Sequence, residues 1–180
     1  MGKIFQLNIK LLTIILFTIM STKTVKASKS NFITLKTSKG SIIIKTLPKI
    51  APNHVKRIKE LVSSGFYNGI IFHRVIDGFM AQTGDPLGNG TGGSGKNLKA
   101  EFSDYEYKYG TVGMARSMNP DSGDSQFFIC FDGCGHLTGQ YTVWGQVETG
   151  MEVVEKIEIG EPPSNPDQII EAFVGKKKTK

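Results

Sequence analysis

Residues 72–85 read FHRVIDGFMAQTGD, two short β-rich runs separated by a glycine. Further runs of the same kind follow, again bounded by glycines: GTVGMA, SQFFICF, YTVWGQV and IIEAFV. Upstream, FITLKTSKGSIIIKTL is typical of a β-hairpin whose turn is Ser38-Lys39-Gly40. Many short strands joined by glycine-rich turns indicate a mainly β fold, either a closed antiparallel barrel or a sandwich.

Only two helices are predicted. Pro52 suits a first helical position and Gly65 a stop, and between them apolar residues recur at helical spacing, which indicates an amphipathic helix of about three turns: Val55, Ile58, Leu61 and Val62. Thr149 and Glu152 have capping-box spacing ahead of a second, shorter apolar run. No repeat or linker divides the chain, so we expect a single domain.

The first 27 residues have the pattern of a cleaved secretory signal. Lys3 and Lys10 come without any acid and are followed by the apolar or threonine stretch 11–20. Small residues at Val25 and Ala27 place the cleavage after Ala27. That apolar stretch is shorter than the roughly 20 residues a membrane-spanning helix needs, so cleavage is favoured over an uncleaved anchor.

Charge gives little indication of a partner once the signal is removed. Residues 1–27 contain four lysines and no acid, so the formal net charge falls from +6 to +2. The remaining basic segment is the tail 176–180, which we interpret as a solvated end. No nucleic-acid partner is therefore expected.

The two cysteines, Cys130 and Cys134, lie in CFDGC. One pair is not a disulfide framework, and the spacing fits neither a zinc site nor a thioredoxin-like redox motif. Two free thiols and one local disulfide are both compatible with this spacing.

Residues 90–96, GTGGSGK, fit the spacing of a phosphate-binding loop. A functional loop of that kind needs a buried strand before it and a helix after it, with Ser or Thr following the lysine. Here GDPLGN precedes the motif, Asn97 follows the lysine, and no helical periodicity comes after it. The segment 84–97 is therefore interpreted as an exposed glycine loop that binds no nucleotide.

Arg74 is the strongest candidate for chemistry. Strand alternation sends His73 and Arg74 to opposite faces, and we interpret His73 as a structural histidine. Arg74 lies close in sequence to Phe79 and Met80, and a permanent cation beside apolar side chains is typical of a binding site. The three histidines and Ser125 form no hydrolase motif.

Three segments in order, FHRVIDGFMAQTGD, GTVGMARSMNPDSGDSQFFI (110–129) and HLTGQYTVWGQV (136–147), closely resemble the cyclophilin family of peptidyl-prolyl cis-trans isomerases. The resemblance extends from Phe32 to about Val174. It implies a closed eight-stranded antiparallel β-barrel capped by two α-helices, in a domain spanning residues 28–175. Cyclophilins also carry a similar glycine loop that binds no nucleotide.

The resemblance implies roles for individual residues. Arg74 corresponds to the catalytic arginine, and Gln82 to the polar residue that orients the substrate backbone. The apolar side chains that would hold the proline ring are Phe79, Met80, Phe128 and Leu137.

Other positions show departures from the family pattern. Ala115 and Arg116 stand where the family has Ala-Asn against the residue before proline, so Arg116 replaces an asparagine. His136 replaces a tryptophan found in many eukaryotic members, which predicts weak or no cyclosporin binding. Tyr141 replaces a histidine, an exchange that also occurs in bacterial periplasmic-type members.

The sequence therefore predicts an isomerase that speeds X-Pro isomerisation during the folding of exported proteins, acting on X-Pro segments of unfolded chains. The alternative is a proline-peptide binding module or holdase on the same fold with little catalysis, for which Arg74 would not be needed. We expect no cofactor and a monomer, located in the periplasm if the host is bacterial.

Overall fold

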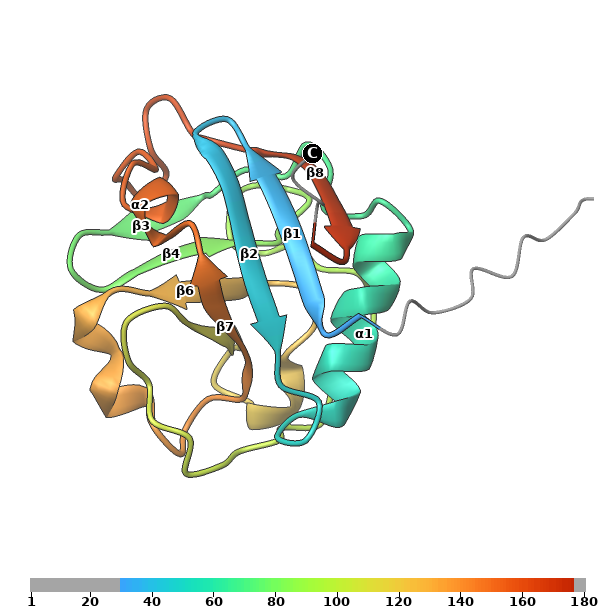
Figure 1. The fold of residues 1–180 in the computed structure, drawn as a ribbon. Coiled ribbons are helices and arrows are strands. Elements are labelled where there is room, and N and C mark those ends of the chain that lie inside the picture. The colour runs from blue at the N-terminus through green and yellow to red at the C-terminus, as the bar shows by residue number, and fades with distance from the viewer. Residues whose placement is uncertain (1–29, 177–180) are drawn as a thin grey trace, which may run out of the picture.

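A computed structural model describes residues 30–176, and the predicted signal segment 1–27 lies outside these residues. Eight strands, two α-helices and two 3-10 helices follow one another along this part of the chain (Figure 1). In order they are β1 (Phe32–Thr37), β2 (Gly40–Thr46), α1 (Pro52–Ser63), β3 (Arg74–Ile76), β4 (Met80–Thr83), β5 (Thr111–Met114), η1 (Pro120–Ser122), β6 (Phe127–Cys130), η2 (Asp132–Leu137), β7 (Val143–Thr149), α2 (Met151–Val154) and β8 (Ile169–Val174).

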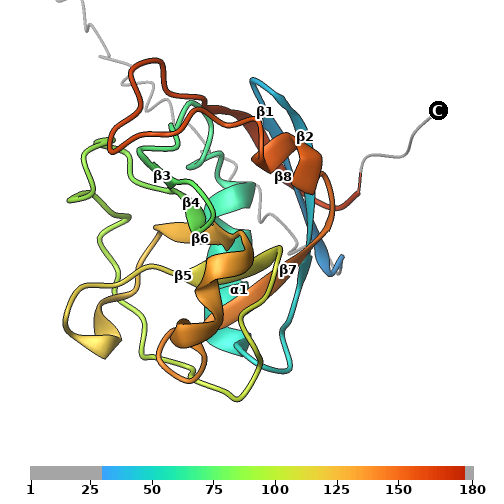
Figure 2. The ribbon, with the colours of Figure 1, turned by 90° about the vertical axis from the view of Figure 1, so that its left-hand side faces the viewer.

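All eight strands belong to one antiparallel sheet with the order β3-β4-β6-β5-β7-β2-β1-β8. The sheet curls, and Figure 2 shows β3, β4 and β6 as neighbours on one side of the molecule. The predicted hairpin is confirmed, because β1 pairs with β2 from Phe32↔Lys45 to Thr37↔Gly40. The predicted mainly β architecture of eight antiparallel strands is confirmed with it.

The prediction of a closed barrel is wrong. The end strands β3 and β8 share no ladder, so the sheet forms a curled half-barrel. Within residues 30–176 the gap is crossed by isolated bridges at Ile71↔Gln168 and Val75↔Gly160 and by a few backbone hydrogen bonds, such as that from the Gly69 N–H to the Ile169 carbonyl. The physical reason is that β3 has only three residues and the chain before it is irregular, so the backbone hydrogen bonds to residues 167–169 do not continue into a ladder along β8.

Helix α1 has the predicted position, with Pro52 in its first turn and Gly65, at a φ of +76°, just beyond its end. Its apolar side chains are buried, and the helix packs against β8 and β7. At its N-terminus the Glu101 carboxylate accepts hydrogen bonds from the backbone N–H groups of Asn53 and His54. A distant loop therefore supplies the cap that the helix's own sequence lacks.

The predicted capping box of the second helix is not formed. Gly150, at a φ of +100°, is the N-cap residue, and no side chain caps α2, which spans only four residues. A Cβ atom on Gly150 would come within 2.4 Å of the Ser41 carbonyl oxygen, so the close approach to β2 sets the helix start instead of Thr149.

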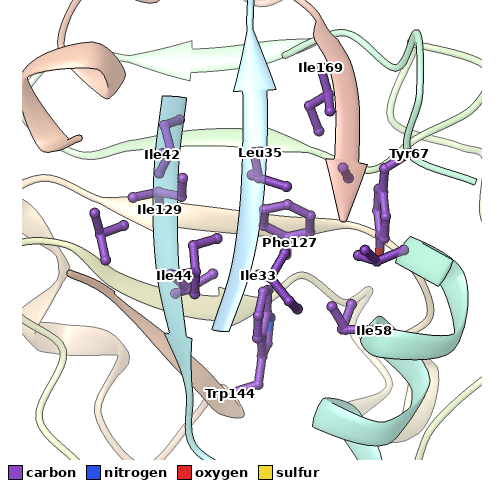
Figure 3. Packing of buried hydrophobic residues seen from close by; sticks show 14 of the residues in the cluster. Ile33, Leu35, Ile42, Ile44, Ile58, Tyr67, Phe127, Ile129, Trp144 and Ile169 are labelled. Atoms are coloured by element: carbon purple, nitrogen blue, oxygen red, sulfur yellow. The ribbon is translucent and has the colours of Figure 1, made fainter. Parts of the chain in front are cut away.

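The main core fills the space between the curled sheet and α1. Figure 3 shows its large side chains interdigitating, with Phe127 edge-on to both Tyr67 and Trp144 at ring-centroid distances of 5.5 and 5.3 Å. The Tyr67 hydroxyl donates to the Ser125 carbonyl, so its polar end is satisfied inside the core. No helix in residues 30–176 is long and apolar enough to cross a membrane.

Candidate active site

A cavity of about 280 Å³ opens beside β3, β4 and β6, and residues of a second buried cluster, among them Met80, Phe128 and Leu137, form part of its lining. It is lined by the ten side chains to which the sequence assigned catalysis or substrate binding. They are Arg74, Phe79, Met80, Gln82, Ala115, Arg116, Phe128, His136, Leu137 and Tyr141. The structure therefore brings the candidate residues together, while their roles stay predictions.

Strand register places the central residues of the cavity. Arg74 on β3 lies opposite Gln82 on β4, and Gln82 lies opposite Phe128 on β6. Phe128 in turn lies opposite Gly113 on β5. One cation, one amide and one aromatic ring thus stand in a row across three hydrogen-bonded strands, which fixes their spacing.

Arg74 is held by an ion pair at the rim of the cavity. Its Nε donates to the Glu161 carboxylate at 2.8 Å, and both side chains are partly exposed. Within residues 30–176 this is the hydrogen bond that its guanidinium makes, so the terminal N–H groups remain available for a ligand. Glu161 lies 87 residues away in sequence, and nothing in the sequence pointed to it.

The apolar wall combines β4 with the 3-10 helix η2. The rings of Phe79 and His136 stack at a centroid distance of 5.6 Å, and Leu137 is buried beside them. Cys130 and Cys134 form a disulfide, and both are completely buried. This bond ties η2 to β6 directly beneath the cavity and decides between the two alternatives that the spacing left open.

Phe128 forms the aromatic floor of the cavity. Tyr107 stacks on one side of its ring at 5.8 Å, and Tyr141 meets it edge-on, also at 5.8 Å. The Tyr107 hydroxyl is buried without a hydrogen-bond partner in the described part of the chain. Burial, with a contribution from Tyr141, raises the pKa of Tyr107, so this phenol stays neutral.

Gln82 connects the cavity to the glycine loop. Its side-chain amide donates to the Gln126 side-chain oxygen at 2.9 Å, and Gln126 donates to the carbonyls of Gly90 and Gly92. Gln126 was not among the predicted site residues. Its neighbour Ser125 was weighed only as a nucleophile, and Ser125 is fully buried.

The amides of the glycine loop point to carboxylates. Asp85 accepts hydrogen bonds from the N–H groups of Leu87, Asn89 and Gly90, and Asp124 accepts from those of Gly95 and Lys96. A phosphate would have to displace these two acids and would be repelled by them. The loop is therefore organised around its own acids, which differs from a phosphate cradle.

His73 is buried, with 4% of its surface exposed, while Arg74 beside it is partly exposed. Burial lowers the pKa of His73, and the charge of Arg74 adds to this effect against the opposing influence of Asp85. The histidine is therefore neutral at pH 7 and buried, which agrees with the structural role that the sequence indicated.

Comparisons with known proteins agree with this arrangement. The family described as cyclophilin type peptidyl-prolyl cis-trans isomerase matches residues 32–174. A protein of Brucella abortus named probable peptidyl-prolyl cis-trans isomerase is 49% identical over 165 residues, covering 82% of this chain and 84% of its own. A peptidyl-prolyl cis-trans isomerase of Helicobacter pylori is 43% identical over 138 residues, covering 74% and 84%.

Solved structures show the same similarity. A cyclophilin from Hirschia baltica superimposes with a TM-score of 0.74 at 29% identity, covering 82% of this chain and 75% of its own. A Cryptosporidium parvum cyclophilin type isomerase, crystallised in the presence of the dipeptide Ala-Pro, gives 0.75 at 27% identity, covering 81% and 99%.

Proposed function

Because the chain belongs to the cyclophilin family and is a peptidyl-prolyl cis-trans isomerase, we propose that Arg74 is its catalytic residue and that the cavity beside it holds the proline ring. The observation that carries this proposal is the position of Arg74. A guanidinium fixed by Glu161 stands at the rim of a cavity whose wall includes the apolar side chains of Phe79 and Met80.

The reaction needs no nucleophile, since no covalent bond is broken. The X-Pro bond has a rotation barrier of roughly 18–20 kcal/mol because resonance keeps it planar. When the bond twists, resonance is lost and the proline nitrogen gains a localised lone pair. An N–H group of Arg74 that donates to this nitrogen binds the twisted state more strongly than either planar state, which is the condition for catalysis.

The remaining side chains hold the substrate still. Phe79, Met80, Phe128 and Leu137 enclose the ring, so that the N-terminal side of the bond turns against a fixed pyrrolidine. The Gln82 amide is placed by Gln126 and stays available to the peptide backbone through its oxygen. A thousandfold acceleration requires about 4 kcal/mol at 1.36 kcal/mol per decade, and one charged donor supplies most of that amount.

The physiological role that fits best is the folding of exported proteins, in the periplasm if the host is bacterial. Two features support it: the signal-like segment 1–27 and the disulfide Cys130–Cys134, which suits an oxidising compartment. N-terminal sequencing of the protein isolated from its host tests this proposal. A mature chain that begins close to Ser28 supports export, whereas a chain that retains Met1 contradicts it.

Isomerase activity itself is measured by NMR exchange spectroscopy on an Ala-Pro peptide with purified residues 28–180. We expect exchange between the cis and trans peptide signals to become fast in the presence of the protein. Peptide shifts without faster exchange would instead indicate a proline-binding module with little catalysis.

A further inference from the structure

Arg116 stands between two hollows of the surface. It lines the cavity that holds the candidate catalytic residues and also an adjoining hollow of about 440 Å³. The two hollows share Gln82, Ala115 and Arg116. A peptide that seats a proline in the first therefore brings its neighbouring residues within reach of Arg116.

The guanidinium of Arg116 is held rigidly. Its Nε and one terminal nitrogen donate to the Gln140 carbonyl at 3.3 and 3.0 Å, and the other terminal nitrogen donates to the Ser117 carbonyl at 2.9 Å. Its central carbon lies 4.3 Å from the centre of the Tyr141 ring and 6.0 Å from that of Phe102. These contacts leave two N–H groups free and have already removed the side chain's rotational freedom.

The charge of Arg116 is not neutralised locally. In residues 30–176 no carboxylate lies within salt-bridge distance of it, whereas Arg74 is paired with Glu161. The carboxylate of Asp124 lines the adjoining hollow and is held there by hydrogen bonds from Ser94, Gly95 and Lys96, and it does not line the cavity itself. The ten residues that line the cavity include no acid, and among them Arg116 is the cation without an acidic partner.

We propose that Arg116 is a specificity-determining residue that makes this isomerase prefer X-Pro segments with an acidic residue next to the proline. The inference rests on the proposed binding of proline in the adjacent cavity. A fixed guanidinium with two free donors matches a carboxylate in shape and charge, while a lysine at the same substrate position is repelled.

The test compares kcat/KM for pentapeptides that differ in one residue, measured by NMR exchange at low ionic strength. One set places Glu, Gln or Lys before the proline, and the other places them after it. We expect the Glu peptide of at least one set to react about three to ten times faster than its Lys counterpart. Raising the salt concentration to about 0.5 M should reduce this ratio, because the Debye length shortens.

Two variants and one control separate charge from folding. Arg116→Gln should bring the Glu-to-Lys ratio close to one, and Arg116→Lys should retain part of it. Lys45→Gln removes the same charge from an exposed position on β2 and should leave the ratio unchanged. A purely structural role for Arg116 would lower the rates of all peptides together without changing the ratio.

The outcomes also distinguish this inference from the proposed function. The acidic preference is wrong if the Gln peptides are isomerised but the Glu-to-Lys ratio is one in both sets. It is also wrong if the ratio in Arg116→Gln equals that of the unmodified protein. In both cases the isomerase assignment stands. If no peptide is isomerised, the proposed function fails and the inference with it.

Discussion

Phe128 lies directly opposite Gly113 in the β5–β6 ladder, and a Cβ atom on residue 113 would come 2.5 Å from the Phe128 Cζ atom and 2.2 Å from the Tyr107 hydroxyl. The aromatic floor of the active site therefore occupies the space that a side chain on β5 would need. Glycine at this position makes room for the ring and fixes its height beneath the substrate.

Gly113→Ala should consequently disturb both stability and catalysis. Overpacking of this kind costs about 1–3 kcal/mol, so the melting temperature should fall and kcat/KM should drop as Phe128 is displaced into the cavity. Gly135→Ala is the matched control, because a Cβ atom there meets no atom within 4 Å. Equal melting temperatures for the two variants would contradict this account of the floor.

The disulfide Cys130–Cys134 should stabilise the fold by constraining the unfolded chain. A closed loop of about five residues corresponds to about 2 kcal/mol in the chain-entropy description. Urea denaturation with and without a reducing agent measures the difference. The double variant Cys130→Ser with Cys134→Ser is the control and should unfold at the same urea concentration with and without the reducing agent. If the urea midpoint of the unmodified protein is also unchanged by reduction, the disulfide contributes nothing to stability.

Asp85 should make the stability of the glycine loop sensitive to acid. Burial on its own would raise the pKa of Asp85, but backbone N–H donors including those of Leu87, Asn89 and Gly90 outweigh it and hold the pKa below its usual value of 3.8. A lowered folded-state pKa contributes stability that is fully present above the unfolded-state value and is lost as the pH falls through the folded-state value.

Asp85→Asn should therefore lower the free energy of unfolding at pH 7 by about 1–3 kcal/mol, since it removes a buried charged acceptor from several partly buried hydrogen bonds. It should also flatten the dependence of stability on pH below about pH 4. Denaturation curves from pH 2 to 7 measure both effects, and the exposed Asp104→Asn serves as the control. An unchanged pH profile in Asp85→Asn would refute this role.

Cyclosporin should inhibit this protein only weakly. His136 stacks on Phe79. The family resemblance implies that a tryptophan at this position would donate its indole N–H to the drug, and His136 lacks that group. His136→Trp should lower the inhibition constant by at least about tenfold, the equivalent of one hydrogen bond of about 1.4 kcal/mol. A nanomolar inhibition constant for the unmodified protein contradicts this prediction.

The sequence predicted correctly the elements that depend on residues within a single short segment. The hairpin of β1 and β2 follows from strand alternation around Ser38 and Lys39, and α1 follows from apolar spacing between Pro52 and Gly65. Closure of the sheet was predicted wrongly because it depends on whether the chain before β3 meets β8 in register. No property of one segment alone determines such a meeting.

In the active site, too, local sequence motifs predicted some features and missed those that depend on distant residues. Motifs identified the residues that line the cavity, but the contacts that position them join residues far apart in sequence. Arg74 bonds to Glu161, 87 residues away, and Gln82 bonds to Gln126, 44 residues away. Neither partner stands in a distinctive local sequence pattern. The uncompensated charge of Arg116 likewise becomes visible only when its neighbours are placed in space.

The most direct test of the central claim compares Arg74→Ala with the unmodified protein by NMR, measuring cis–trans exchange and peptide affinity on the same samples. Removing the charged donor should slow catalysed exchange by about a hundred- to a thousandfold, corresponding to about 2.7–4 kcal/mol, because the donor acts only in the twisted state. The peptide dissociation constant should change by less than about threefold, and circular dichroism should confirm the fold. Catalysed exchange that persists undiminished in Arg74→Ala would contradict the assignment of catalysis to this guanidinium.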